Sequence, residues 1–285
     1  MMRGRIVAAV DGSASSTAAV EWAAGDAQRR RLPLRIVHVC EQWALGIDSA
    51  RYCAGALEAA ADRARAISGD VEVVAEMLAG NVIDALILES ASADSLVLGS
   101  RGMGGFAGMV LGSVGGAVAG HAAGTVVIVR GVVAVRHDLV VAGDDGSAGS
   151  RQAMAYAVEQ ARARHARLHV VYAWQAPAVS PYWAAYSHLL ADSFQEEARA
   201  ARARVTPWRN ENPDVVITDE QVRGHPVAAL TEATAAADLV VVGSRGRGGF
   251  SSAVLGSVSH GVLHHAACPV AVVRPHADEG VSWPV

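Results

Sequence analysis

The feature that most constrains the fold of this 285-residue chain is an internal repeat. Residues 10–13 (Val-Asp-Gly-Ser) recur as residues 144–147 (Asp-Asp-Gly-Ser), 134 positions later. Further along, residues 99–113 recur as residues 243–257, with eleven of fifteen positions identical. A match of this length indicates one module duplicated in tandem. The separation grows to 144 residues in the later match, which places an inserted loop around residues 176–190 of the second copy.

Each copy alternates short, β-branched apolar segments with Ala-rich segments of helical length. The expected strands are 6–10, 34–39, 71–77, 95–98 and 125–129, and then 139–142, 168–173, 215–222, 239–242 and 270–273. Apolar strands that alternate with helices are typical of parallel sheets covered on both faces. Right-handed crossovers then predict an α/β fold of two tandem doubly wound, Rossmann-like modules, each with a five-stranded parallel sheet. We expect module 1 at 1–133, module 2 at 137–276 and a tail at 277–285.

Charge, cysteine content and hydropathy indicate which partners and surroundings the protein is suited to. A net charge of −4 with interspersed signs does not favour nucleic acid, which rewards a basic face. Three cysteines, an odd number without metal-ligand spacing, favour reduced thiols in a cytoplasmic protein. The apolar stretch 109–129 has a counterpart in the second copy that contains three histidines, so we expect no membrane span.

The carboxyl ends of the strands are the expected ligand site, because open parallel sheets bind ligands there. Asp11 and Asp145 follow the first strand of each copy. Such an aspartate either supports the turn into the next helix, or accepts hydrogen bonds from a nucleotide and helps to hold a divalent ion. The second strands end near Val39 and Ala173, where free backbone groups suit an adenine edge.

A glycine-rich loop follows the fourth strand of each copy and ends in Leu-Gly-Ser at the start of the next helix. Glycines permit positive φ and let a phosphate approach the backbone, and a helix N-terminus presents free N–H groups to an anion. Ser113 either caps this helix or donates its hydroxyl to a phosphate. Arg101, Arg245 and Arg247 would add positive charge to the loop.

Several other chemistries are disfavoured. The run 102–107 resembles a dinucleotide fingerprint, but it comes too late in the module. The chain has no Lys to serve in a P-loop, and it has no Gly-x-Ser-x-Gly elbow. His260, His264 and His265 have helical spacing but no accompanying carboxylate or Cys. We therefore expect no catalytic residues and no metal site made by the protein alone.

The loop carries a complete Gly-x2-Gly-x9-Gly-Ser pattern in both copies, beginning at Gly99 and at Gly243. In this the sequence resembles the universal stress protein family, over nearly the whole chain. The resemblance implies an adenine nucleotide alpha hydrolase-like fold and ATP bound in each module, with Mg²⁺ near Asp11 and Asp145. It also implies that the modules pair through their last strands as an intramolecular pseudo-dimer, and it leaves a homodimer of chains open.

The two copies are expected to bind with unequal affinity, since Ala9 stands where the second copy has Gly143, and Met103 where it has Arg247. The nucleotide-binding residues expected in the first copy are Ala9, Asp11, Val39, Gly99, Ser100, Arg101, Gly102, Gly104, Gly105, Gly112 and Ser113. Those expected in the second are Gly143, Asp145, Ala173, Gly243, Ser244, Arg245, Gly246, Arg247, Gly248, Gly249, Gly256 and Ser257.

The function that the resemblance implies is an ATP-binding regulatory protein of the stress response, in which occupancy changes conformation or assembly. The alternative is a slow ATPase or nucleotidyl-transfer enzyme that uses the same sites. Sustained turnover would distinguish the second from the first.

Overall fold

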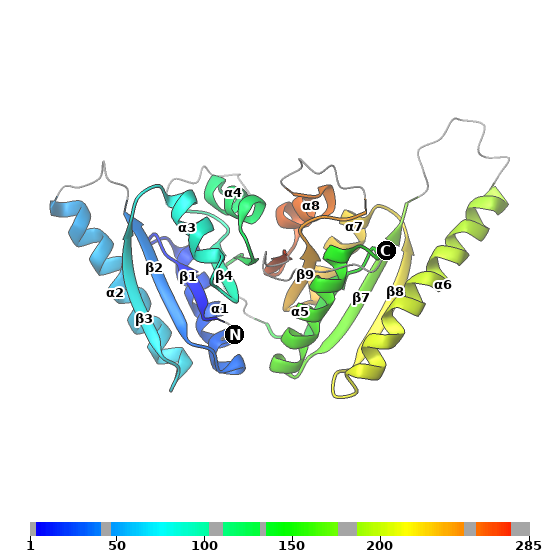
Figure 1. Ribbon diagram of the computed structural model, residues 1–285, viewed down its shortest axis with the longest axis horizontal. Coiled ribbons are helices and arrows are strands. Elements are labelled where there is room, and N and C mark those ends of the chain that lie inside the picture. The colour runs from blue at the N-terminus through cyan, green and yellow to red at the C-terminus, as the bar shows by residue number, and fades with distance from the viewer. Residues whose placement is uncertain are drawn as a thin grey trace, which may run out of the picture. The chain divides into compact units, whose positions relative to one another are not determined.

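The computed structural model describes residues 4–40, 47–102, 111–131, 135–175, 187–247 and 255–274, without the side chains of residues 47–50 and 187–190. These residues form ten β-strands and eight α-helices. The chain divides into two compact units (Figure 1). Unit 1 takes the chain up to Ala134 together with the last strand, and unit 2 runs over Val135–Cys268.

Unit 1 is a parallel sheet with helical crossovers. In chain order its elements are β1 (Ile6–Ala9), α1 (Ala14–Arg30), β2 (Leu34–Cys40), α2 (Ile47–Ser68), β3 (Val73–Ala79), α3 (Val82–Ser90), β4 (Ser95–Gly99), α4 (Ser113–His121) and β5 (Thr125–Val129). The strand order is β3-β2-β1-β4-β5, and all four pairings are parallel. The last strand, β10 (Val270–Val273), pairs antiparallel with β5 and is grouped with unit 1, although the repeat counts it as the final strand of the second copy.

Unit 2 repeats this plan. Its elements are β6 (Leu139–Gly143), α5 (Ala148–Arg164), β7 (Arg167–Trp174), α6 (Ser187–Glu211), β8 (Ile217–Arg223), α7 (Pro226–Ala233), the 3₁₀ turn η3 (Thr234–Ala236), β9 (Leu239–Gly243) and α8 (Ser257–His265). Its parallel strands lie in the order β9-β6-β7-β8. The predicted doubly wound α/β fold is therefore confirmed, with strand ends that differ from the expected ones by one or two residues.

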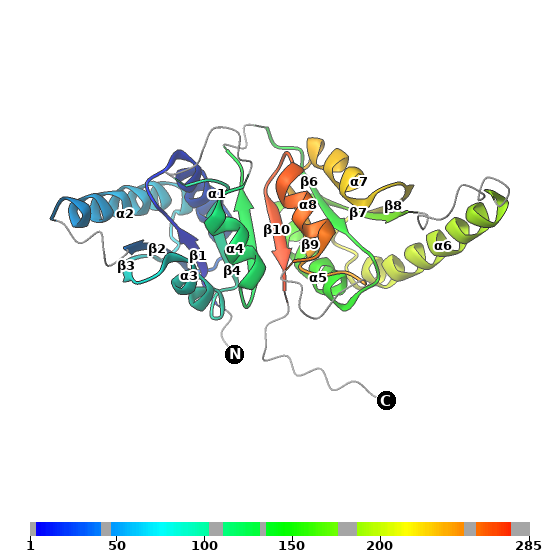
Figure 2. The same ribbon diagram turned by 90° about the horizontal axis from the view of Figure 1, so that it is seen from above.

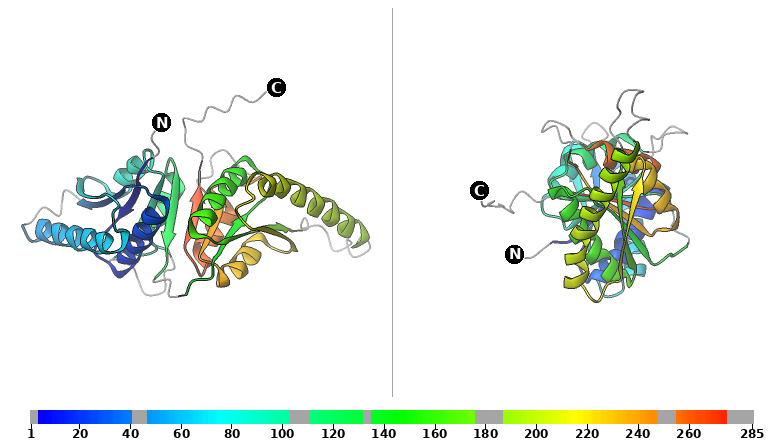
Figure 3. Two further views of the ribbon diagram at one scale, coloured as in Figure 1. Left: turned by 90° about the horizontal axis from the view of Figure 1, so that it is seen from below. Right: turned by 90° about the vertical axis from the view of Figure 1, so that its right-hand side faces the viewer.

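Helices cover both faces of each sheet. In unit 1, α1 and α2 lie together on one face while α3 and α4 lie together on the other (Figure 2). In unit 2, α5 and α6 run along one face of the sheet (Figure 3) and α7 packs with α8 on the other. All five positions of β5 are buried, whereas the edge strand β3 has only half-buried and exposed positions. Among the described helices, none is long and apolar enough to cross a membrane.

A serine begins the first helix of each unit. Ser13 Oγ accepts a hydrogen bond from the Ser16 amide at 3.1 Å, and Ser147 Oγ accepts one from the Ser150 amide at the same distance. These N-caps satisfy amides that would otherwise lack a partner in the first turn. They start α1 and α5 directly after β1 and β6, and so hold Asp11 and Asp145 at the carboxyl edge of the sheet.

Candidate functional site

The carboxyl edge of the unit 2 sheet contains a cavity of about 630 Å³. It lies where β6, β7 and β9 end and where α8 begins. Nine of the residues expected to bind nucleotide line it: Gly143, Asp145, Ala173, Gly243, Arg245, Gly246, Arg247, Gly256 and Ser257. Ser244 is buried instead, and Gly248 and Gly249 lie outside the described residues. The volume falls in the range of small-molecule sites, roughly 300–1,000 Å³.

Asp145 joins two segments of this cavity wall. Its Oδ1 accepts a hydrogen bond from the Ser147 amide at 2.9 Å, and its Oδ2 accepts one from the Arg247 amide at 2.9 Å. Burial alone would raise the pKa of Asp145, but hydrogen bonds from Ser147, Arg247 and Ser150 outweigh it and hold that pKa below 3.8. The carboxylate is therefore charged at neutral pH. It supports the turn, as one interpretation of the sequence held, and it also positions the glycine loop.

The loop glycines allow close approach. A Cβ on Gly243 would lie 2.8 Å from the Gly149 carbonyl carbon, and a Cβ on Gly246 would clash with the Asp145 carboxylate. The sequence also suggested positive φ in this loop, but the described glycines with positive φ lie elsewhere, at Gly12 and Gly146 among other turns. The glycines at the start of the loop are thus required by packing against the first helix and its aspartate.

The N-terminus of α8 faces the cavity without a side-chain cap from the described residues. Gly256 is the N-cap and its amide donates to the Ser244 carbonyl at 2.8 Å, which closes the base of the loop. Ser257 is the first helical residue, so its hydroxyl is not the cap, and the same holds for Ser113 after Gly112 in unit 1. A glycine cap leaves the first amides of the helix available to an anion.

Sequence reasoning missed a charged network on the same wall. Asp144 is buried and accepts hydrogen bonds from Arg204 Nε at 2.8 Å and from Ser150 Oγ at 2.9 Å. The Arg204 guanidinium lies 5.3 Å from the centre of the Tyr172 ring. The only signal in the sequence was that Asp144 replaces an apolar residue, Val10, of the first copy.

The network continues to the glycine loop. The Tyr172 hydroxyl donates to Glu197 at 2.9 Å, and Arg247 lies 3.5 Å from the same carboxylate oxygen. Burial and the neighbouring Glu197 raise the pKa of Tyr172 to about 12, so the hydroxyl remains a donor at neutral pH. Arg247 therefore binds the long helix α6 as well as the loop, which gives it a structural role beside the predicted one.

Unit 1 places its predicted residues in the same way. Asp11 Oδ1 accepts from the Ser13 amide at 2.9 Å, and a Cβ on Gly102 would lie 2.7 Å from Asp11 Oδ2. The Gly112 amide donates to the Ser100 carbonyl at 2.8 Å, as its counterpart does. The Arg101 amide donates to Ser15 Oγ at 3.2 Å. Gly104 and Gly105 lie outside the described residues.

The remaining predicted residues of unit 1 lie on its strands and the first helical turn. Ala9 ends β1 and pairs with Val37, and Val39 pairs with Leu78 in the β2–β3 ladder. Ser113 begins α4, and Gly99 packs against Ser15, whose carbonyl carbon would lie 2.6 Å from an added Cβ. These positions all lie along the carboxyl edge of the sheet, although their ligand contacts stay a prediction.

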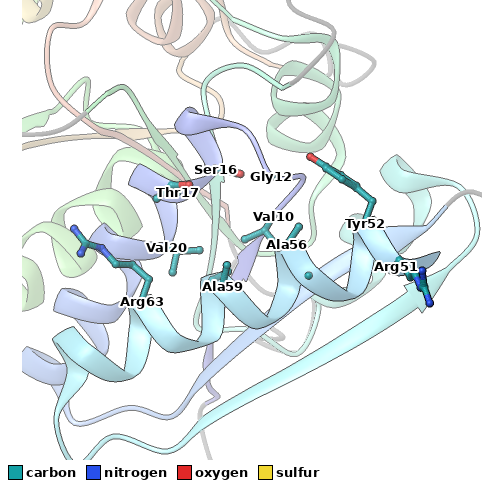
Figure 4. Close-up of a pocket in the computed structure, with 12 residues that line it drawn as sticks. Val10, Gly12, Ser16, Thr17, Val20, Arg51, Tyr52, Ala56, Ala59 and Arg63 are labelled. Atoms are coloured by element: carbon teal, nitrogen blue, oxygen red, sulfur yellow. The ribbon is translucent and has the colours of Figure 1, made fainter. Parts of the chain in front are cut away.

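Unit 1 also has a cavity in a different place. It measures about 500 Å³ and lies between α1 and α2, where Tyr52 projects from α2 toward Gly12 (Figure 4). The Tyr52 hydroxyl donates to the Asp11 carbonyl at 3.2 Å. The residues that line this cavity include none of those predicted to bind nucleotide. The surroundings of Asp11 in unit 1 therefore differ from those of the equivalent Asp145 in unit 2.

Comparison of the sequence with known proteins identifies one family over nearly the whole chain. The model of the universal stress protein family matches residues 2–130 and 137–274. A universal stress protein of Mycolicibacterium smegmatis is 36% identical over 292 residues, which cover 95% of this chain and 97% of the relative. One from Mycobacterium tuberculosis strain H37Rv is 34% identical, covering 94% and 96%.

The fold has a counterpart among solved structures. A universal stress protein from Archaeoglobus fulgidus superposes with a TM-score of 0.70 and covers 96% of this chain and 99% of its own. Its sequence identity is 21%, so this likeness concerns the fold alone.

Proposed function

The chain belongs to the universal stress protein family, and on that premise we propose that it is a regulatory protein that binds ATP at the carboxyl edge of each module. The observation that carries the proposal is the unit 2 cavity, which brings the β9–α8 loop, Asp145 and the end of β7 to one place. Three segments far apart in the sequence thus line one site of suitable size.

The residues present suit an adenine nucleotide. The uncapped start of α8 would receive phosphate oxygens, with Arg245 and Arg247 as nearby cations. The backbone at Ala173, at the end of β7, would receive the adenine edge. The charged Asp145 carboxylate would accept from a ribose hydroxyl or help to hold a Mg²⁺ that accompanies the phosphates.

Regulation rather than turnover is the proposed role. Asp145 is held by backbone amides of both the turn and the loop, so it is positioned as an anchor and not as a mobile base. We expect ATP occupancy to change the conformation of the module or the assembly of chains. The pairing of the two modules through their last strands, and a cytoplasmic location, belong to the same proposal.

Equilibrium binding with purified protein tests the proposal. We expect dialysis against labelled ATP with Mg²⁺ to show saturable binding at or below millimolar concentration. The double variant Asp11→Ala with Asp145→Ala should lose it, while its circular dichroism stays that of the parent. No saturable binding by the parent protein would refute the proposal. Sustained phosphate release that is lost in the double variant would favour the ATPase alternative.

A further inference from the structure

The end of β2 and the first half of α2 bring together three metal-ligating side chains. One ring nitrogen of His38 and the sulfurs of Cys40 and Cys53 all lie within 4.8 Å of one another. His38 and Cys40 are two residues apart on a strand and therefore point to the same face of the sheet. Cys53 reaches them from the helix that covers that face.

The imidazole of His38 has an unused ligand atom. Its side chain is only 6% exposed, and its Nδ1 is buried without a hydrogen-bond partner among the described residues. The ring is also hydrogen-bonded to the backbone of Val10, the kind of contact that orients a metal-bound histidine. A buried polar atom without a partner is unfavourable unless something binds it.

The matching place in unit 2 is filled differently. The repeat aligns His38 with Tyr172, Cys40 with Trp174 and Cys53 with Glu197. There the tyrosine hydroxyl donates to the glutamate at 2.9 Å, and Trp174 packs against Phe194 with ring centres 5.9 Å apart. The second module therefore satisfies its polar groups internally, whereas the first has two thiols and a free ring nitrogen.

We propose that His38, Cys40 and Cys53 bind one Zn²⁺ per chain. Two thiolates and an imidazole are a typical zinc donor set, and three protein ligands leave a fourth position for water. Ligands about 2.0–2.3 Å from a shared ion are at most about 4.6 Å apart, so small side-chain rotations suffice. Cys40 is partly exposed, which gives the ion a route to the site. This inference does not depend on ATP binding.

A disulfide between Cys40 and Cys53 is the competing use of the same thiols. Cys40 and Cys53 are not joined by a disulfide in the structure. A disulfide would join only the two sulfurs of the cluster. A disulfide would also leave His38 Nδ1 without a partner, whereas a metal ion would use all three groups.

Cobalt substitution tests the site directly. The full-length protein, stripped of metal and kept reduced, is titrated with Co²⁺, and Zn²⁺ is then added as competitor. We expect thiolate-to-cobalt charge-transfer absorption that saturates at one equivalent and is displaced by Zn²⁺. Absence of this absorption in the parent protein would overturn the proposal, whatever the behaviour of any variant.

Matched variants locate the ligands. Cys40→Ser, Cys53→Ser and His38→Tyr, the last of which installs the residue of unit 2, should each weaken Zn²⁺ binding by more than about 100-fold, since loss of outer-shell partners alone weakens it 10–100-fold. Cys268→Ala removes the third, buried thiol and should leave binding unchanged. Cobalt absorption that survives Cys40→Ser and Cys53→Ser, but disappears in Cys268→Ala, would contradict the assignment. Circular dichroism of the metal-free variants checks their fold.

Discussion

Asp145 connects the turn after β6 to the loop after β9 through two backbone hydrogen bonds, each of 2.9 Å. Gly246 makes the second contact feasible, because any Cβ at that position would meet the carboxylate. The shape of the cavity wall thus depends on a charged oxygen and on the absence of one side chain. Substitutions at these two residues should affect ligand binding before they affect the core.

Gly246→Val should displace the loop from Asp145 and weaken ATP binding by about tenfold or more, equivalent to about 1.4 kcal/mol or more. Equilibrium dialysis against ATP measures the change. Gly55→Ala is the matched control, because a Cβ at that exposed position of α2 would meet no atom of another described segment within 4 Å. Equal affinities for the two variants would show that close approach to Asp145 does not shape the site.

The lowered pKa of Asp145 predicts a pH-dependent contribution to stability. Because the folded pKa lies below the ordinary value of 3.8, the carboxylate stabilises the fold above that value, and the stabilisation is lost as the pH falls through the folded pKa. Asp145→Asn cannot titrate. The difference in unfolding free energy between parent and variant should therefore be constant near neutral pH and shrink in acid.

Urea unfolding from neutral pH to below 3.8 measures this difference. Asp62→Asn, which removes an exposed carboxylate from α2, serves as the control for the loss of one charge. A difference that grows in acid, or one that is the same for both variants, would contradict the assignment to Asp145.

Residue-level prediction from the sequence was uneven for a physical reason. Asp145 and the loop were found because the repeat displays them twice. The cluster of His38, Cys40 and Cys53 was not found, because Cys53 joins it only through the register of α2 against the sheet. No spacing rule encodes that register, and the same is true of the pair between Asp144 and Arg204.

At the scale of elements, a buried ion pair joins the last residue of α1, Arg30, to Asp94, the residue just before β4. Arg30 donates to both carboxylate oxygens of Asp94, at 2.5 and 2.9 Å, and it also lies 3.5 Å from the buried Asp26. Both side chains of the main pair are less than a tenth exposed. Removing one partner of a buried ion pair is destabilising, because the other charge stays buried without compensation.

Arg30→Gln should lower the unfolding free energy by about 3 kcal/mol, since it removes the Arg30 cation from the buried Asp94 carboxylate, whereas Asp26 keeps its contact with Arg29. Arg65→Gln breaks an exposed pair with Asp62 on α2 and should cost less than about 1 kcal/mol. Urea denaturation compares the two variants at equal pH and salt. Similar losses would show that burial does not decide the strength of these pairs.

Element positions were the most predictable part of the fold. Apolar β-branched runs marked all ten strands, because parallel strands are buried on both faces. Ser13 and Ser147 are the N-caps of α1 and α5, a position that serine favours. The serines of the Leu-Gly-Ser motif were ambiguous, since a glycine before a serine can itself be the N-cap, as it is at Gly256.

At the scale of the whole molecule, duplication has produced two modules that share a frame and differ at their sites. Unit 2 has the cavity at the glycine loop, the Asp144–Arg204 pair and the Tyr172–Glu197 contact. Unit 1 has Tyr52 beside Asp11 and the cysteine–histidine cluster. Strand β10, which the repeat assigns to the second copy, pairs with β5 and so extends the sheet of unit 1. We therefore expect the modules to bind ATP unequally, with unit 2 the tighter site.

Calorimetric titration of ATP with Mg²⁺ into the parent chain and into the single variants Asp11→Ala and Asp145→Ala tests this account most directly. We predict two unequal sites in the parent chain, loss of the tighter site in Asp145→Ala, and loss of the weaker site in Asp11→Ala. Binding that Asp145→Ala leaves unchanged, or no saturable heat in the parent chain at millimolar ATP, would contradict it.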